Sequence, residues 1–362
     1  MTENSRSMGA SSVIEVDDLI IDFPIDAAFF KKKYLRAVNQ VSFQLESGRA
    51  LALVGESGSG KSTCARALTR LYQPTSGSMT LDGVEINDPH IGLSRIELAR
   101  QVQMIFQDPF GSLNPIHTAG HHLLRPFKLH RPELSGSELI ENVYEVLARV
   151  GLNPPELIFN KYPHELSGGQ RQRLAIARAV STGARFILAD EPISMLDVSI
   201  RLGILNLMAD MKNDGIGFLY ITHDIATARY FAEATAVMYV GHMVEWGDSD
   251  SVTQTPRHPY TQLLIDAVPE VGRARKERMV SPGKSQIPLW TADSRGCPFV
   301  DRCPLVESRC HSEMPMITKI SDNHFARCFA LESTNQCDVK ETKTDHQIRA
   351  ENDTGLRIND EI

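Results

Sequence analysis

The sequence predicts an α/β protein whose core is a parallel β-sheet, with a smaller unit appended at its C-terminal end. Three short apolar runs, RALALVG, RFILADEP and IGFLYITHD, have the composition of strands that are buried on both faces. Helical patterns separate these runs along the chain, as in folds where helices connect parallel strands. A glycine-rich loop follows the first run and opens a helix, which is typical of the edge of such a sheet.

The N-terminal part of the chain has the pattern of half-buried strands. Residues 1–12 are polar and are predicted to be disordered. From Val13, apolar and polar residues alternate in VIEVDDLIIDF and again in AVNQVSFQL. Between them lie three lysines, Lys31 to Lys33, which we interpret as part of a solvated loop, with contact to acidic lipid headgroups as the alternative. Residues 133–180 have helical patterns that NPPE and YPHE interrupt.

The loop GESGSGKST fits the phosphate-binding pattern G-x-x-x-x-G-K-[ST]. Its glycines let backbone N–H groups turn inward around phosphate oxygens, and the following helix adds the positive end of its dipole. We expect Lys61 to contact the β- and γ-phosphates of a nucleotide and Ser62 to contact Mg²⁺. The predicted nucleotide-binding residues of this loop are Gly55, Glu56, Ser57, Gly58, Ser59, Gly60, Lys61, Ser62 and Thr63.

Two carboxylates end the second apolar run, in FILADEP. Asp190 is in a position to hold Mg²⁺ through water, and Glu191 can orient and deprotonate an attacking water. The alternative is that the two acids cap a helix at the end of a strand. Because a phosphate-binding loop occurs in the same chain, nucleotide hydrolysis is the favoured interpretation.

The stretch HELSGGQRQRLAIARA predicts a helix that Ser167 caps. Gly168 and Gly169 leave the first backbone N–H groups bare, so the mouth of this helix is a second candidate anion site. The phosphate loop already has a helix of its own. The N-terminal end of this second helix is therefore expected to contact the nucleotide from the side opposite the phosphate loop. The alternative is an ordinary capped helix that binds no ligand.

The composition of the chain excludes some classes of protein. The formal net charge of −7 argues against a broad surface for nucleic acid. The polar start lacks the apolar stretch of a signal peptide, and no uncharged apolar run approaches the ~18 residues that cross a bilayer. We expect a cytosolic protein, or one that a partner holds at a membrane.

Six motifs occur in the order that is found in ABC ATPases. Besides the phosphate loop and the acidic strand end, LSGGQRQR resembles the signature sequence of that family. Gln107 in MIFQDP matches the Q-loop glutamine, and His223 in YITHD matches the switch histidine. SMLD, from Ser194 to Asp197, matches the D-loop. The chain thus resembles an ABC ATPase over about residues 13–255.

The resemblance implies a P-loop NTPase fold of the ABC cassette type. Such a cassette has a parallel-sheet core, an antiparallel β part and a helical subdomain, which we expect at about residues 108–182. Two cassettes clamp two ATP molecules at a shared interface. The residues implied to contact ATP held by the partner subunit are Ser167, Gly168, Gly169 and Gln170.

The resemblance also assigns roles within one cassette. His223 would steady the γ-phosphate and the water, and Gln107 would sense Mg²⁺ and relay closure to a membrane partner. Phe23 is the expected adenine-stacking aromatic, with Tyr34 as the alternative. The implied catalytic residues are Glu191, His223 and Gln107, and the implied Mg²⁺ contacts are Ser62, Gln107 and Asp190.

The C-terminal region changes in character and contains five of the six cysteines. RHPYTQLLIDAVP and GCPFVDRCPLVESRC resemble the extension of oligopeptide and dipeptide importer ATPases, which we expect at residues 256–331. Four thiolates can hold zinc or an iron–sulfur cluster. The resemblance implies one four-iron four-sulfur cluster, with zinc as the alternative, on Cys297, Cys303, Cys310 and Cys328. Residues 332–362 are predicted to be a disordered tail.

The resemblance implies the ATP-hydrolysing subunit of a bacterial importer on the cytoplasmic face of the inner membrane. Its expected partners are a second ATPase subunit, identical or different, two transmembrane permease subunits and, indirectly, an extracytoplasmic solute-binding protein. Peptides are the expected cargo, with oligosaccharides, nickel or opines as alternatives. Two other classes remain open: a soluble ABC ATPase of DNA repair or translation, and a redox sensor that uses the ATPase as its output.

Overall fold

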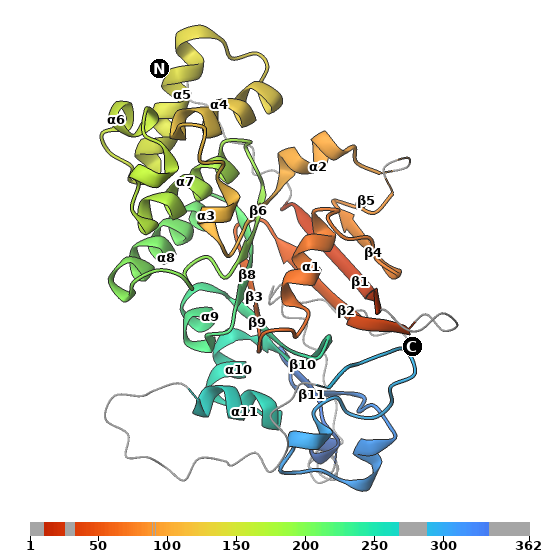
Figure 1. Cartoon of the computed structure of the whole chain (residues 1–362). Coiled ribbons are helices and arrows are strands. Elements are labelled where there is room, and N and C mark those ends of the chain that lie inside the picture. The colour runs from red at the N-terminus through yellow and green to blue at the C-terminus, as the bar shows by residue number, and fades with distance from the viewer. Residues whose placement is uncertain (1–10, 26–32, 89, 91, 268–287, 333–362) are drawn as a thin grey trace, which may run out of the picture.

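The computed structural model describes residues 11–25, 33–88, 90, 92–267 and 288–332. Residues 1–10 of the predicted disordered start, Lys31 and Lys32, and the predicted tail after Glu332 lie outside these ranges. The described residues form two β-sheets and the helices around them (Figure 1).

The first sheet is antiparallel, with the order β2-β1-β4-β5. Its long strands are the two that residue alternation predicts, and they bury alternate residues. The bounds of the strands are β1 (Val13–Ile25), β2 (Lys33–Glu46), β4 (Ser76–Leu81) and β5 (Val84–Glu85).

The second sheet has eight strands in the order β11-β12-β10-β9-β3-β8-β7-β6. The five strands from β9 to β6 are parallel, and β10, β12 and β11 continue the sheet in antiparallel fashion. The three apolar runs form the buried strands β3, β8 and β7, as predicted. The bounds are β3 (Ala50–Val54), β6 (Val102–Ile105), β7 (Phe186–Asp190), β8 (Gly217–Thr222), β9 (Ala234–Tyr239), β10 (His242–Asp248), β11 (Ile317–Ser321) and β12 (His324–Arg327).

Helices surround the two sheets. Most of the segment between β6 and β7 is helical and forms a group of its own, on the left in Figure 1. The helices are α1 (Lys61–Leu68), α2 (Arg95–Gln101), α3 (Pro109–Ser112), α4 (Ala119–His130), α5 (Gly136–Arg149), α6 (Pro155–Phe159), α7 (Gly168–Val180), α8 (Val198–Asn213), α9 (Ile225–Phe231), α10 (Ser249–Gln254) and α11 (Pro259–Asp266), with 3₁₀ turns η1 (Pro163–Glu165), η2 (Val300–Arg302) and η3 (Ser308–His311).

The parallel sheet separates two hydrophobic cores. Leu51 and Leu53 of β3 pack with α1 and the antiparallel sheet. Ala52 and Val54, which point to the other face, pack with α7, α8 and α9. Side chains alternate between the faces of a strand, so α1 and α7 belong to opposite faces of one sheet.

The C-terminal extension adds two strands to the main sheet, which no local pattern in the sequence predicts. β12 pairs with β10 through Glu245↔Ala326 and its neighbours, and β11 pairs with β12. A third core joins the cassette to the extension and contains Tyr239, Tyr260 and Phe299. The extension therefore packs on the cassette as a continuation of its sheet.

Within the described ranges, we find no helix with the length and apolarity that crossing a bilayer requires.

Candidate nucleotide site and cysteine region

The predicted phosphate-binding and catalytic residues of one cassette lie at the carboxyl ends of four neighbouring strands. The phosphate loop follows β3, and Gln107 follows β6. Asp190 ends β7, Glu191 comes next, and His223 follows β8. The structure therefore brings together side chains from distant parts of the chain, at the edge where open α/β sheets bind ligands.

The phosphate loop has the backbone that its glycines permit. Gly60 has a φ of +99°, and a Cβ at this position would lie 2.4 Å from the carbonyl oxygen of Ala37. Gly58 has a φ of +82°, and a Cβ there would point into open space. A positive φ is costly for other residues, so the glycines favour a curled loop beside free volume, which fits a bound phosphate.

Lys61 is buried at the base of this loop. Its Nζ donates to the carbonyl oxygens of Gly55 (2.7 Å) and Glu56 (2.8 Å) and to Ser59 Oγ (3.0 Å). Burial lowers the pKa of Lys61 to about 8, although the nearby carboxylates, Glu191 first, oppose this shift. The ammonium group lies where it can exchange loop oxygens for phosphate oxygens.

Ser62 and Asp190 form a pair that fits a hard cation. Ser62 Oγ donates to Asp190 Oδ1 at 2.7 Å. Burial raises the pKa of Asp190, and the hydrogen bond from Ser62 opposes this shift. A hydroxyl and a carboxylate oxygen are ligands that Mg²⁺ accepts, so these residues fit the predicted ion.

Glu191 lies between the other two predicted catalytic residues. Its Oε2 accepts from Gln107 Nε2 at 3.0 Å, and its Oε1 is 3.4 Å from His223 Nδ1. Its φ is +46°, a conformation that residues other than glycine adopt infrequently and that often occurs at functional sites. The backbone is fixed by a hydrogen bond from its N–H to Ile221 O (2.9 Å). Ser194 Oγ of the D-loop donates to the carbonyl oxygen of Glu191 at 3.0 Å.

Ser167 caps α7, as predicted, through a reciprocal capping box. Its Oγ accepts from the N–H of Gln170 (3.3 Å), and the Gln170 side chain accepts from the N–H of Ser167 (3.0 Å). Ser167 is exposed, whereas Gly169 is buried, and a Cβ there would lie 2.9 Å from Ile200 of α8. One of the two glycines is therefore required for helix packing. The exposed D-loop residue Asp197 immediately precedes α8.

The two candidate adenine-stacking residues lie in different surroundings. Phe23 is half-buried and packs edge-on against Tyr72, with 5.0 Å between ring centroids. Tyr34 is 42% exposed. They are close across the β1–β2 pair, since Pro24 is opposite Tyr34.

The four C-terminal cysteines lie in one region but not in a metal-ligand arrangement. Cys297 N–H donates to Cys310 O at 2.8 Å, and both residues belong to the third core with Cys303 beside them. Burial raises the pKa of Cys297 to about 12 and that of Cys328 to about 11, and nearby thiols add to both shifts. Across the residues that the structure covers, no group of three or more His, Cys, Asp or Glu is placed to hold a metal ion.

A metal would therefore have to draw these thiols together and displace their protons. The chemistry of four thiols fits either predicted metal group.

Two contacts to the phosphate loop were not predicted from the sequence. Tyr260 Oη accepts from the N–H of Glu56, and Arg302 pairs with the carboxylate of Glu56. Both residues lie within the motifs that resemble the importer extension, but nothing in their spacing along the chain points to the distant phosphate loop.

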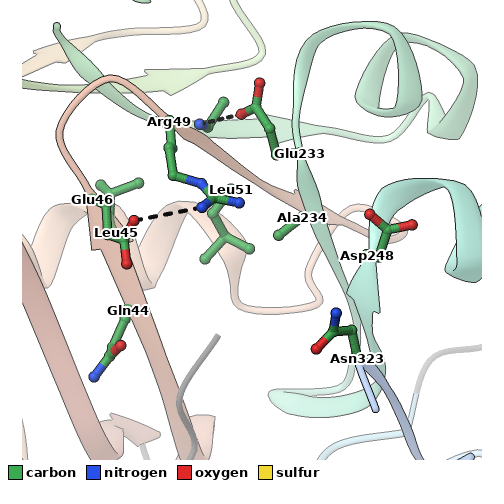
Figure 2. Close-up of a pocket in the computed structure, with 10 residues that line it drawn as sticks. Gln44, Leu45, Glu46, Arg49, Leu51, Glu233, Ala234, Asp248 and Asn323 are labelled. Atoms are coloured by element: carbon green, nitrogen blue, oxygen red, sulfur yellow. Dashed lines mark hydrogen bonds and ion pairs between the residues drawn. The ribbon is translucent and has the colours of Figure 1, made fainter. Parts of the chain in front are cut away.

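A small pocket lies at the opposite edge of the main sheet (Figure 2). Glu233 accepts from the N–H of Ala50 at 2.7 Å and so closes one side of it. Its lining comes from the amino ends of β3 and β9 and from neighbouring chain: Gln44, Leu45, Glu46, Arg49, Ala50, Leu51, Glu233, Ala234, Asp248 and Asn323. It contains none of the predicted site residues.

Comparisons with known proteins define the class. The sequence model of the ABC transporter family matches residues 38–194. The dimeric structure of the ATP-binding cassette MJ0796 in a post-hydrolysis state bound to ADP and Pi is similar, with a TM-score of 0.57 and 29% identity over 65% of this chain and 98% of that chain. The fold is that of an ABC ATPase, as predicted.

Within that class, the model for the C-terminal region of oligopeptide/dipeptide transporters matches residues 244–310. The oligopeptide transport ATP-binding protein AppF of Bacillus subtilis is 39% identical over 323 residues, covering 88% of this chain and 97% of the relative. The di/tripeptide transport ATP-binding protein DppF of Pseudomonas aeruginosa is 40% identical, with 87% and 97% covered. The chain belongs to the family of oligopeptide/dipeptide ABC transporter ATP-binding proteins.

Proposed function

We propose that this ABC ATPase powers the uptake of oligopeptides or dipeptides through a bacterial membrane transporter. The observation that carries the proposal is the importer-type extension, which is combined with a complete set of ATP-site residues. Relatives that match over nearly their whole length are oligopeptide and di/tripeptide transport proteins, which supports peptides over oligosaccharides, nickel or opines.

We assign the site residues as follows. ATP supplies the phosphoanhydride bond that is hydrolysed, and Mg²⁺ neutralises its phosphates. Glu191 orients and deprotonates the water, Gln107 and His223 hold Glu191 in place, and Lys61 binds the phosphates. Ser62 and Gln107, and Asp190 through water, would hold Mg²⁺. One of the aromatics Phe23 and Tyr34 stacks on adenine.

Two cassettes, identical or different, close on two ATP molecules. The exposure of Ser167 and the position of α7 on the sheet face opposite α1 support a contact between subunits rather than within one. The similar MJ0796 cassette is a dimer in its solved structure, which agrees with this arrangement. We divide the chain into a cassette at 13–255, with a helical subdomain near 108–182, and an extension at 256–331.

The cassette pair docks on two transmembrane permease subunits at the cytoplasmic face of the cell membrane, and a solute-binding protein delivers the cargo outside. The four cysteines of the extension bind one iron–sulfur cluster, with zinc as the alternative. The burial of Cys297, Cys310 and Cys328, and the third core that contains Cys297 and Cys310 with Cys303 beside them, support a structural role for this group.

Transport assays test the cargo. Cells that express this chain with its permease should accumulate a labelled tripeptide, and cells with the Glu191→Gln variant should not. Competition by unlabelled peptides, but not by nickel or oligosaccharides, is expected. Glu191-dependent uptake of another solute class in place of peptides would contradict the peptide assignment and leave the ATPase assignment intact.

A further inference from the structure

The phosphate loop and the C-terminal extension are joined by an ion pair. Arg302 Nη1 donates to Glu56 Oε2 at 2.8 Å, and Nη2 donates to Oε1 at 2.9 Å. This is the bidentate geometry in which arginine pairs best with a carboxylate. The Arg302 side chain is 12% exposed and that of Glu56 is 30% exposed. The pair is thus better shielded from water and salt than a surface pair.

Arg302 is held in place by aromatic residues of the third core. Its guanidinium carbon lies 5.6 Å from the ring centroids of both Tyr239 and Phe299. Tyr239 Oη accepts from Arg302 Nη1 at 3.4 Å. The hydrogen bonds to Glu56 raise the pKa of Arg302, so its charge is permanent. The guanidinium is therefore presented to Glu56 in one fixed place.

Glu56 is also held through its backbone. Its N–H donates to the buried Tyr260 Oη of α11 at 2.8 Å, and its carbonyl oxygen accepts from Lys61 Nζ at 2.8 Å. Three contacts, two of them from the region beyond β10, fix the second residue of the phosphate loop. The direction of the loop N–H groups depends on that residue, so these contacts help to set the shape of the phosphate site.

Arg302 lies inside the cysteine region. It ends η2, which lies between Cys297 and Cys303 in the sequence and is followed directly by Cys303. Val300 N–H donates to Cys297 O at 3.1 Å, and Cys297 N–H donates to Cys310 O at 2.8 Å. The position of Arg302 is thus set by the local fold of the cysteine-bearing segment.

We propose that Arg302 is a positioning residue for the phosphate loop, and that it couples the fold of the cysteine segment to nucleotide affinity. The inference rests on nucleotide binding at the loop. Arg302 neutralises a carboxylate that would otherwise lie unpaired beside the phosphates, and it restrains the loop in its curled form. Loss of the pair weakens binding without removing any group from the reaction itself.

Binding and steady-state kinetics of the full chain test this. In Arg302→Met, the Kd of a labelled ATP analogue and the KM should rise about tenfold, while kcat stays within twofold. Arg302→Lys keeps the charge but loses the bidentate geometry, so its Kd should lie between the Kd of the wild type and that of Arg302→Met. Arg309→Met is the matched control, because Arg309 pairs with Glu307 and Glu332 in the same extension and should leave the Kd unchanged.

A double-mutant cycle with Glu56→Gln decides whether Arg302 acts through Glu56. If it does, the double variant binds the analogue within twofold of Glu56→Gln alone. Cys303→Ser should raise the Kd in the wild-type background and not in Glu56→Gln. Should Arg302→Met fail to fold, the cycle with Arg302→Lys provides the same comparison.

An additive cycle, an equal effect of Arg309→Met, or an Arg302→Met Kd within twofold of wild type would overturn the positioning role. An unchanged Kd in Cys303→Ser would overturn the link to the cysteine segment. Failure of the wild-type chain to bind the analogue would instead contradict nucleotide binding itself.

Discussion

At the scale of single residues, Glu191 connects the groups that the reaction requires. Gln107 and His223 approach its two carboxylate oxygens from the neighbouring strand ends, and its φ is positive. The resemblance to ABC ATPases implied that these residues act together, and the structure brings them to the edge that the carboxyl ends of the parallel strands share. The sequence could not predict that the Lys61 ammonium group donates hydrogen bonds to oxygens of the phosphate loop, since those contacts depend on side-chain packing.

Glu191→Gln is expected to stop turnover and leave ATP binding intact. The amide keeps the hydrogen-bonding shape but cannot accept the proton of the attacking water. Loss of a general base lowers rates by roughly 10²–10⁴-fold. ATPase assays and equilibrium titration measure the two effects separately. A variant that hydrolyses ATP within threefold of wild type would show that the base is another group.

The affinity for ATP should fall as the pH rises through about 8. The pKa of Lys61 is lowered to about 8 by burial, so the free protein loses this charge above that pH. Bound phosphates favour the charged form, and binding then requires uptake of a proton. Between pH 7 and pH 9 the Kd should rise about tenfold. Lys61→Arg stays charged and should give a flat profile, and a flat profile in the wild type would disprove the titration.

At the scale of secondary-structure elements, strong local patterns were predictable. The buried runs correspond to β3, β7 and β8, and the Ser167 cap marks the start of α7. The strands β11 and β12 were not predicted, because ITKIS and HFAR are short and partly polar. They form strands because β12 pairs with the edge of β10 and β11 pairs with β12. Such pairing between distant segments is not encoded in the local sequence pattern.

The cysteine segment gives a prediction at this scale. With few apolar residues to hold η2 and η3, this region should depend on a metal group, as small metal-binding units do. Anaerobic purification should give a brown protein, and Cys303→Ser with Cys310→Ser should remove the colour and increase proteolysis within residues 288–332. Stoichiometric zinc without iron in a colourless wild type would favour the alternative metal. A wild-type protein that contains neither iron nor zinc would contradict both metal assignments.

At the scale of the whole molecule, buried histidines join the cassette to the extension. His258 caps α11 by accepting the N–H of Tyr260 at Nδ1, and the buried Glu245 accepts from the N–H of His258. Glu245 also pairs with His324 of β12 at 2.7 Å. The junction therefore depends on buried polar groups, and such groups destabilise the fold when they lose their hydrogen-bond partners.

Acid should weaken this junction. Burial lowers the pKa of His258 to about 4 from an ordinary 6.5, against the attraction of Glu245. Between these values the unfolded chain binds the proton and the folded chain does not, so stability falls as the pH drops from about 6.5 towards 4. The loss at pH 5 is at most about 2 kcal/mol. Urea unfolding should show a shallower pH dependence in His258→Asn, which keeps a cap acceptor, but not in the exposed control His311→Asn.

The dimer is the final property that the whole fold implies. The helix α1, which follows the phosphate loop, and the helix α7, which Ser167 caps, pack on opposite faces of one sheet. We therefore expect Ser167 to contact the nucleotide of a second chain and not that of its own chain. In the Glu191→Gln background, which keeps ATP bound, ATP should therefore produce a dimer in analytical ultracentrifugation if the chain pairs with itself. Adding Ser167→Arg should abolish that dimer, because the bulky arginine side chain occupies the exposed N-terminal end of α7. Each monomer should still bind ATP as before. His164→Arg, an exposed change just before the cap, is the control.

A dimer that persists in the Ser167→Arg variant would contradict the contact between subunits, and ATP binding without self-association in the background variant would indicate a different partner cassette.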